Sequence, residues 1–572
     1  MPFDSTAPAA GYVAAFIDAA QQYVTANPGR AALLGLFYTP VLIVVLNILR
    51  QLVVPRDPSL PPEVFHWVPF IGSSIAYGND PLNFFFKCRE KYGDVFTFTL
   101  IGRKVTVALG AKGNNFVLGG KSTAFSAEDA YTACATFLAS QMPYLNHQQH
   151  LTTPVFGKDV VYDVPNEVFM EQKKFVKVGL STENFRAYVS MFEQEVDDFM
   201  RSDQAFLIWQ MNDINEWGRF DVTDIMAQIT ILTASRTLQG KEVRSGLDKS
   251  FSALYNDLDG GFTPLNFMFP NLPLESYRRR DEAHKKMSEY YTDIIRKRRE
   301  TGHTEESDMI SALMDQKYRD GRPLRDHEIA HIMIALLMAG QHTSSASGSW
   351  TLLHLAHNLE VQEALYQEQV EHFGNPDGTF RPMTYEAFRK LPVLDSVIRE
   401  TLRLHPPIHS IMRYVRSDVP VPATLAAPSK DGVYVVPKGY YVLACAAVSQ
   451  VDPRVWANPM KWDPVRWSDP EGVAAQAFKT YSDEHGEKID YGFGAVSKGT
   501  ESPYQPFGAG RHRCIGEQFA YLQLGTVISN IIRKVELRLE DGITDIPAHN
   551  YHTMITMPKK PRNICYRRRK FD

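Results

Sequence analysis

The sequence predicts a mainly α-helical protein with small β-sheets, an α+β fold, behind a single N-terminal membrane helix. Three observations predict it: long stretches with helical apolar spacing, short zones of alternating β-type residues, and a charge-free apolar run near the N-terminus. The 572 residues are 44% hydrophobic and carry a net charge of −4, typical of a packed globular protein and not of a nucleic-acid binder. We expect an anchor segment over residues 1–54 and one globular unit over residues 55–572.

The apolar run covers residues 31–49, which are 19 residues without a charge between Arg30 and Arg50. At about 1.5 Å per residue it spans about 28 Å, close to the ~30 Å thickness of the bilayer hydrocarbon. A secretory signal is the competing interpretation, but about thirty mixed residues precede the run and no small-residue cleavage site follows it. Residues 8–27 have amphipathic spacing that suits a membrane surface. Five scattered cysteines indicate a reducing compartment, so the globular unit is expected on the cytosolic side.

Behind a proline-rich connector, period-two alternation over residues 95–110 predicts a hairpin turning at Gly102-Arg103. Further β-rich zones follow at about 408–450 and 535–567. Helical spacing predicts the long helices. These are residues 171–202, 221–240, 275–300, 327–370 and 384–405.

One cysteine has neighbours that suit a metal-bound thiolate. Cys514 lies in FGAGRHRCIG, residues 507–516, among glycines and cations and in front of an apolar helix. Gly508, Gly510 and Gly516 permit a tight positive-φ backbone around a sulfur, and backbone N–H groups with nearby cations favour a thiolate. Phe507 can shield one side of it, and the flanking Arg511, His512 and Arg513 offer charge to an anionic cofactor. A structural cysteine would need none of these.

A buried helix carries an unusual polar run. Residues 329–339, IAHIMIALLMA, are apolar nearly all round, and they continue without a stop into the polar stretch 340–345, GQHTSS. Thr343 can bond back to the carbonyl of Ala339 and merely bend the helix. The same distortion can open a turn at Ala339-Gly340, leaving a groove for a diatomic ligand beside the Thr343 hydroxyl. Both interpretations fit the sequence.

These two motifs resemble those of the cytochrome P-450 superfamily, a fold in which a cysteine thiolate is the axial ligand of haem iron. The resemblance implies that Cys514 is that ligand and that AGQHTS is the distal oxygen-activation motif. Most members place an acid before the threonine, whereas His342 stands here, as in the sterol 14α-demethylases. The stretch NDLDGGFTPLNF supplies Asp259, which matches the carboxylate that relays protons with that histidine. His342 as a satisfied core histidine is the alternative.

The resemblance also implies roles for other residues. Glu400 and Arg403, three apart on one helix face, would form a buried charge network with Arg466 that locks the cysteine loop. Haem binding is implied for Cys514, Phe507, Gly508, Arg413, His512, Tyr131, Tyr162 and Lys173, the last five as propionate partners. The pocket wall is implied to include Tyr131, Phe156, Tyr162, Phe262, Phe267, Ile411 and Met554.

Matches over most of residues 60–570 are similar to the fungal sterol 14α-demethylases in particular. The family removes the 14α-methyl group of lanosterol or eburicol in three oxidations during ergosterol synthesis. It uses haem b, O2 and electrons from NADPH delivered by NADPH–cytochrome P-450 reductase, with cytochrome b5 as a further donor. The implied location is the endoplasmic reticulum membrane, single-pass, with the catalytic unit cytosolic and in contact with membrane lipid. The alternatives are a haem-thiolate hydroxylase of another lipid or xenobiotic and a non-catalytic haem- or sterol-binding membrane protein.

One insertion departs from the family pattern. Between Thr132 and His150 stand seventeen extra residues, 133–149, where the family runs almost directly from one to the other. Seventeen codons would suit a short fungal intron, so a retained intron is one hypothesis. A lengthened loop over the substrate mouth is the other, since functional loops tolerate insertions. Sequencing the transcript, and the mass of the purified protein, decides between them.

Overall fold

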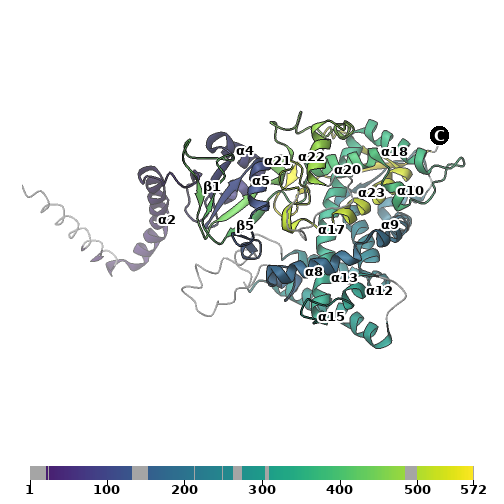
Figure 1. Ribbon diagram of the computed structural model, residues 1–572, viewed down its shortest axis with the longest axis horizontal. Helices are drawn as coiled ribbons and strands as arrows, with labels where there is room; N and C mark the ends of the chain where they lie inside the picture. The colour runs from purple at the N-terminus through teal and green to yellow at the C-terminus, as the bar shows by residue number, and fades with distance from the viewer. Residues whose placement is uncertain are drawn as a thin grey trace, which may run out of the picture.

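The computed structural model describes residues 18, 21–22, 25–131, 152–211, 213–247, 249–261, 273–302, 308–482 and 499–570. A large helix-rich part is joined to a smaller sheet-containing part, and one helix stands apart from both (Figure 1). The helices are α2 Pro28–Val53, α3 Ser74–Asn79, α4 Pro81–Tyr92, α5 Gly110–Leu118, α7 Thr153–Phe156, α8 Asn166–Gly179, α9 Thr182–Ser202, α10 Leu207–Gln210, α11 Val222–Ala234, α12 Lys241–Ser245, α13 Lys249–Asp259, α15 Glu275–Thr301, α16 Met309–Met314, α17 Asp326–His357, α18 Leu359–Phe373, α19 Tyr385–Phe388, α20 Pro392–Leu404, α21 Ala446–Gln450, α22 Val473–Tyr481 and α23 Glu517–Lys534.

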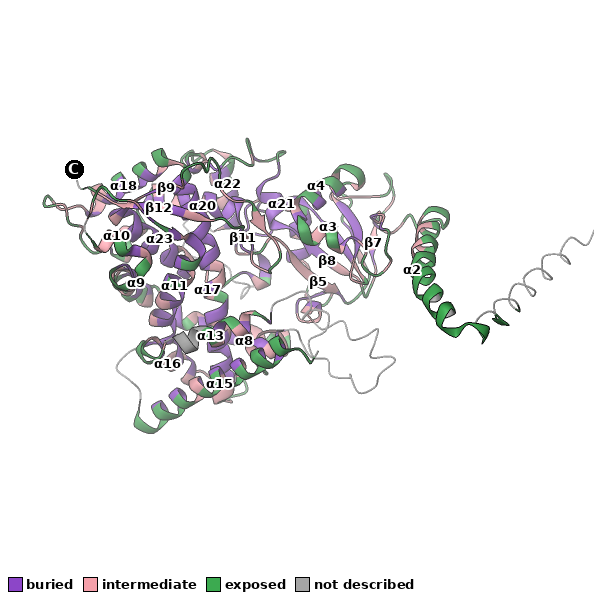
Figure 2. Ribbon diagram, turned by 180° about the vertical axis from the view of Figure 1, so that it is seen from behind, coloured by how far each residue is buried: buried purple, intermediate pink, exposed green. Residues whose placement is uncertain are grey.

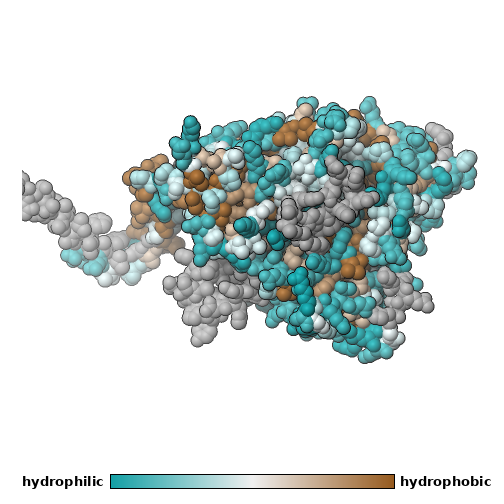
Figure 3. Space-filling view, in the orientation of Figure 1, coloured by the Kyte–Doolittle hydropathy of each residue, from teal (hydrophilic) through white to brown (hydrophobic). Residues whose placement is uncertain are grey.

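The separate helix, α2, contains the predicted anchor 31–49 and extends beyond it at both ends. Of the described helices it is the one long and apolar enough to cross a membrane. It is exposed along its length, and hydrophobic side chains gather over it (Figures 2 and 3). Near its C-terminal end the Asn47 and Gln51 amides each donate to the carbonyl of His66, at 2.9 and 2.7 Å. These bonds tie the helix to the start of the globular unit.

The smaller part is built on a five-stranded sheet with the order β1-β2-β8-β5-β3. The predicted hairpin is present as β1 Val95–Leu100 and β2 Arg103–Ala108. Its two-residue turn is Ile101-Gly102, both at positive φ, so it begins one residue before the predicted Gly102-Arg103. The zone predicted at 408–450 supplies β5 Ile411–Val415 and β8 Tyr441–Ala444, and β8 runs parallel to β2. Segments far apart in the sequence therefore share one sheet.

The other strands form small sheets at the periphery. The zone predicted at 535–567 supplies four of them, β9 to β12, and β12 and β9 form a three-stranded sheet with β4, in the order β4-β12-β9. These strands are β4 Gly218–Asp221, β6 Val419–Pro420, β7 Val435–Val436, β9 Val535–Leu539, β10 His549–Asn550, β11 Met557–Pro558 and β12 Asn563–Arg568. The strand β3 Phe125–Ser126 is the edge strand of the five-stranded sheet.

Three predicted long helices are each divided in two. The stretch 171–202 breaks into α8 and α9 at Ser181, whose hydroxyl accepts from the Asn184 N–H and caps α9. The stretch 327–370 breaks at Asn358, between α17 and α18. The stretch 384–405 breaks before Pro392, which starts α20 at its first turn. Periodicity alone missed these breaks because apolar spacing continues across them.

Helix α17 is the centre of the helix-rich part. It packs against α11, α15 and α23, and its residues are buried around nearly the whole circumference (Figure 2). The polar run 340–345 does not interrupt it, since the α-helix is continuous from Asp326 to His357. The expected opened turn at Ala339-Gly340 is therefore not present as a break in the helix.

Candidate functional site

The cysteine loop precedes α23, and its backbone folds tightly around Cys514. Gly508 and Gly510 both have φ +69, and a Cβ on Gly510 would lie 2.3 Å from the carbonyl of Leu118, so only glycine fits there. Gly516 does not share this conformation: its φ is −83 and it caps α23. The Cys514 N–H donates to the carbonyl of Phe507 at 3.0 Å. The loop thus presents the sulfur at the N-terminus of a long buried helix.

The charges of the loop are arranged differently from the expectation. Arg513 is buried and donates to Glu517 from Nε at 2.8 Å and from Nη2 at 3.0 Å, with its guanidinium against the Tyr481 ring. Its charge therefore holds the loop to α23 and is not offered to a cofactor. Burial raises the pKa of the Cys514 thiol despite a hydrogen bond from the Gly516 N–H and nearby Lys173. In the protein alone the thiol is favoured, and a metal would deprotonate it on binding.

The middle of α17 has open space beside it. Ala339 is exposed and Gly340 is only partly buried, although most of α17 is buried, and nothing lies within 4 Å of a Cβ built on Gly340. The Thr343 hydroxyl donates to the Ala339 carbonyl at 2.7 Å, which is the back-bond that the sequence allowed. This hydroxyl is half-exposed at the same stretch of helix. A small ligand can therefore approach the helix at this point.

His342 and Asp259, the two residues that the resemblance pairs, lie close together. His342 Nε2 lies 3.1 Å from Asp259 Oδ1, at the end of α13, but the angle is not that of a hydrogen bond. The imidazole is 22% exposed and the carboxylate 46%. Burial lowers the pKa of His342 and outweighs the opposing effect of Asp259, so the imidazole is neutral near pH 7. The pair joins a partly exposed carboxylate to a largely buried imidazole.

A group of cationic and aromatic residues lies near the cysteine loop. Tyr131 and Tyr162 are stacked with ring centroids 4.7 Å apart, and Arg413 acts electrostatically on both rings and on His512. Burial and neighbouring cations lower the pKa of His512, which is therefore neutral. Lys173 donates to the carbonyls of Arg511 and Arg513, at 3.1 and 3.0 Å.

The residues Arg413, His512 and Cys514 are suited to bind an anionic haem. Arg413 is only 5% exposed and forms no ion pair with any described carboxylate. A buried unpaired cation is costly, so an anionic group is needed beside it. His512 Nδ1 is likewise buried without a hydrogen-bond partner in the described part of the chain. Cys514 is accessible although atoms surround it closely, which leaves its sulfur free to bind.

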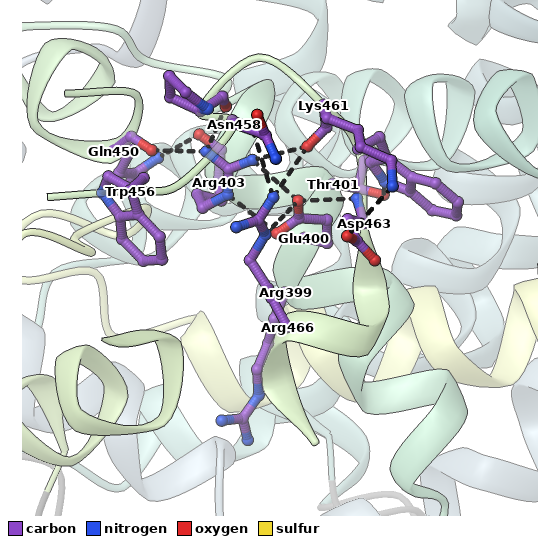
Figure 4. A network of polar contacts seen from close by, with 12 residues as sticks. Arg399, Glu400, Thr401, Arg403, Gln450, Trp456, Asn458, Lys461, Asp463 and Arg466 are labelled. Carbon is purple, nitrogen blue, oxygen red and sulfur yellow. Dashed lines mark hydrogen bonds and ion pairs between the residues drawn. The ribbon is translucent and has the colours of Figure 1, made fainter. Parts of the chain in front are cut away.

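Glu400, Arg403 and Arg466 come together in a buried network (Figure 4). The Glu400 carboxylate accepts from Arg403 Nη2 at 2.8 Å and from Arg466 Nε at 2.9 Å. Arg403 also donates to the carbonyls of Gln450 and Pro459, and the Glu400 and Arg403 side chains are both 0% exposed. The network joins α20 to the segment that precedes the cysteine loop.

The predicted pocket residues lie in separate segments. Phe156 ends α7 and is half-buried, and Ile411 starts β5 with its Cδ1 3.3 Å from a Cβ built on Gly508. Met554 is half-buried in the segment between β10 and β11. Phe507 packs on Tyr521 with ring centroids 5.4 Å apart. Phe262, Phe267 and the insertion 133–149 lie outside the described residues.

The sequence analysis missed two residues of this region. Tyr255 is buried with its ring centroid 5.2 Å from that of His342, and it shares a face of α13 with Asp259, four residues on. Glu517, the partner of Arg513, is also four residues on. In both cases a spacing of four residues, from Tyr255 to Asp259 and from Arg513 to Glu517, was the sequence signal that could have revealed the contact.

A family model described as "Cytochrome P450" matches residues 61–566. The retinoic acid-bound cyanobacterial CYP120A1 has the same fold, with a TM-score of 0.68 at 19% identity, over 90% of this chain and 100% of that chain. The chain therefore belongs to the cytochrome P450 family, as the cysteine loop predicted. The helix-rich fold with small sheets is confirmed.

Relatives with much higher identity narrow the assignment to one branch of that family. The lanosterol 14-alpha demethylase of Mycosarcoma maydis is 53% identical over 91% of this chain and 90% of its own length. The sterol 14-alpha demethylase CYP51A of Gibberella zeae is 47% identical over 96% and 98%. A sterol 14-alpha demethylase of Aspergillus flavus is 47% identical over 92% and 94%. Within the cytochrome P450 family, the chain belongs to the sterol 14α-demethylases.

Proposed function

We propose that this protein removes the 14α-methyl group of lanosterol or eburicol in ergosterol synthesis. Three oxidations, each consuming O2 and NADPH, take the methyl to the alcohol, to the aldehyde and out as formate, leaving a C14–C15 double bond. The observation that carries the proposal is the 53% identity to a lanosterol 14-alpha demethylase over 91% of the chain. The buried Arg413, which pairs with none of the described carboxylates, and the accessible Cys514 support it.

The residues around the cysteine loop suit the binding of haem b. Haem with a thiolate axial ligand supplies the activation of O2 and the oxidation of a C–H bond. Cys514 would hold the iron, and Arg413, His512, Lys173, Tyr131 and Tyr162 would bind the propionates. Phe507 and Gly508 shape the loop beside the sulfur. The Glu400 network would keep the loop in place and has no part in the chemistry.

Proton delivery would use α13 and α17. The Asp259 carboxylate is close to half-exposed and can take a proton from water, and His342 Nε2 is 3.1 Å away. Because burial keeps that imidazole neutral, it can accept a proton from the carboxyl side and release it inward. The Thr343 hydroxyl on the next residue lies beside the open space at Gly340 and would donate a hydrogen bond into that space on releasing the Ala339 carbonyl. The continuous helix would orient both side chains.

The pocket and membrane assignments complete the proposal. Phe156, Phe262, Phe267, Ile411 and Met554 would form an apolar wall suited to a sterol. Residues 1–54 would anchor the protein through α2 in the endoplasmic reticulum membrane as a single pass, with residues 55–572 in the cytosol. NADPH–cytochrome P-450 reductase would supply electrons, with cytochrome b5 as a further donor.

The carbon monoxide difference spectrum of the purified protein, followed by turnover of lanosterol with the reductase, tests the proposal. We expect a thiolate-type Soret band, demethylated sterol and formate, and Cys514→Ala should abolish the band. A band without demethylated sterol would indicate a hydroxylase of another substrate. Sterol binding without any oxidised product would indicate a non-catalytic protein. A Cys514→Ala variant that kept the band would remove Cys514 as the ligand.

A further inference from the structure

The segment of residues 157–163, which follows α7 and includes the short helix Val161–Asp163, has an unfavourable backbone. Gly157 has φ +101, Asp159 has φ +64 and Val161 has φ +55. Positive φ is uncommon for any residue with a Cβ and is a genuine outlier for the β-branched Val161. Such a conformation persists only where surrounding contacts over-determine it. The partners of this segment therefore decide its shape.

Polar side chains from two other elements hold Asp159 in place. Its carboxylate Oδ2 accepts from His327 Nε2 at 3.0 Å and from Arg325 Nη2 at 3.1 Å, both at the start of α17. Its carbonyl accepts from Gln172 Nε2 on α8 at 2.8 Å. Its N–H donates to Asp163 Oδ2 at 2.8 Å. Each polar group of Asp159 is thus bound in the positive-φ conformation.

His331, on α17, is a further buried side chain that contacts this segment. Its Nδ1 lies 2.9 Å from the carbonyl of Lys158, and its Nε2 lies 3.3 Å from the hydroxyl of Ser288 on α15. Burial lowers the pKa of His331 to about 4, with the nearby His284 and His327 adding to the effect. The neutral ring therefore donates from Nδ1 to the carbonyl and accepts from the hydroxyl at Nε2.

The ring of His331 also limits the segment sterically. A Cβ on Gly157 would lie 2.3 Å from its Cγ, so the backbone at Gly157 rests directly against the imidazole. His331 is 7% exposed and cannot move aside into solvent. One side chain therefore fixes the segment at two consecutive residues, by contact at Gly157 and by a hydrogen bond at Lys158.

The segment adjoins one residue of the predicted pocket wall and contains another. Phe156 precedes it directly, and Tyr162 lies within it and stacks on Tyr131. We propose that His331 is a positioning residue for the sterol: it holds residues 157–163 in their strained conformation and so keeps Phe156 and Tyr162 in the pocket wall. This inference rests on the proposed function, because it assumes a sterol between those side chains.

The test measures sterol binding and turnover in the haem-loaded enzyme with its reductase. His331→Leu removes the donor to Lys158, and a buried hydrogen bond corresponds to about a five- to tenfold change in affinity. We therefore expect the lanosterol KM, and the Kd from the sterol-induced Soret shift, to rise about five- to tenfold, with kcat within about twofold. His331→Asn should restore most of the affinity, because its amide can donate from nearly the position of Nδ1.

A matched control and a second variant make the result decisive. His357→Leu removes an exposed histidine from the far end of α17 and should leave KM unchanged. Gly157→Ala displaces the segment from the opposite side and should raise KM even if His331→Leu fails to load haem. Wild-type sterol affinity in His331→Leu or in Gly157→Ala, or no recovery in His331→Asn, would overturn the inference. Failure of the proposed function is distinct, since the unmodified enzyme would then give no demethylated sterol.

Discussion

The substitution Glu400→Gln tests the buried charge network. The carboxylate accepts five hydrogen bonds: from Arg403 Nη2, the Asp463 N–H and Arg466 Nε at Oε1, and from Arg403 Nε and Trp467 Nε1 at Oε2. A glutamine in its best orientation keeps the first three acceptor contacts. It then points its amide N–H2 at Arg403 Nε and Trp467 Nε1, so that donors face donors. The change also leaves two guanidinium groups without their shared carboxylate.

The magnitude follows from burial. Because the Glu400 and Arg403 side chains are 0% exposed, water cannot replace the lost partner, and breaking such a pair costs about 3–5 kcal/mol. The free energy of unfolding of a folded protein is about 5–15 kcal/mol, so this cost is a large share of it. The control is Glu282→Gln, whose carboxylate pairs with Lys286 at 3.3 Å while both side chains are more than half exposed. That exposed ion pair contributes less than about 0.5 kcal/mol to the free energy of unfolding.

Urea unfolding of the two variants and the unmodified protein measures the effect. Tryptophan fluorescence is a suitable signal, because Trp467 itself donates to Glu400. We expect the free energy of unfolding to fall by about 3–5 kcal/mol in Glu400→Gln and to stay unchanged in Glu282→Gln. Equal free energies for the two variants, within about 1 kcal/mol, would refute the reasoning that this buried network stabilises the fold.

Four further predictions concern the site, the pH dependence and the anchor. Thr343→Ala should keep the carbon monoxide band but lower demethylation at least about tenfold relative to NADPH consumed, and equal coupling would exclude a role for the hydroxyl. Arg413→Leu should lower the haem content of the purified protein; full loading would show that another cation suffices. Burial lowers the pKa of His549 from 6.5 to about 4, so the unfolded chain binds a proton that the folded protein does not, and stability should fall as the pH drops through that window. His549→Gln should reduce this fall by on the order of 1–3 kcal/mol in urea titrations, and an unchanged pH profile would contradict the assignment. Deletion of residues 1–54 should release the protein from the membrane fraction on cell fractionation, and its retention there would point to another anchor.

Local patterns were sufficient to predict much of this molecule. The cysteine loop, the apolar run of α2 and the hairpin at 95–110 are contiguous in the sequence, and the chemistry of each depends on neighbours within about ten residues. The pairing of Glu400 with Arg403 could be predicted from the sequence for the same reason, since a helix brings residues three apart onto one face. The helix breaks were harder to predict. The cap of α9 at Ser181 and the start of α20 at Pro392 are each signalled by a single residue inside a longer apolar pattern.

Only the tertiary structure decided which charges neutralise one another. Arg513 and Arg413 both looked available to an anionic cofactor, yet Glu517 occupies the first and no described carboxylate reaches the second. The protonation of Cys514 depends likewise on burial, which no flanking residue reveals.

The contact between His331 and Lys158 joins residues 173 apart in the chain, so no local pattern could reveal it. By itself the sequence determined the chemical groups and the order of the elements. Packing determined their solvation and their partners, because both depend on what other parts of the chain bring near.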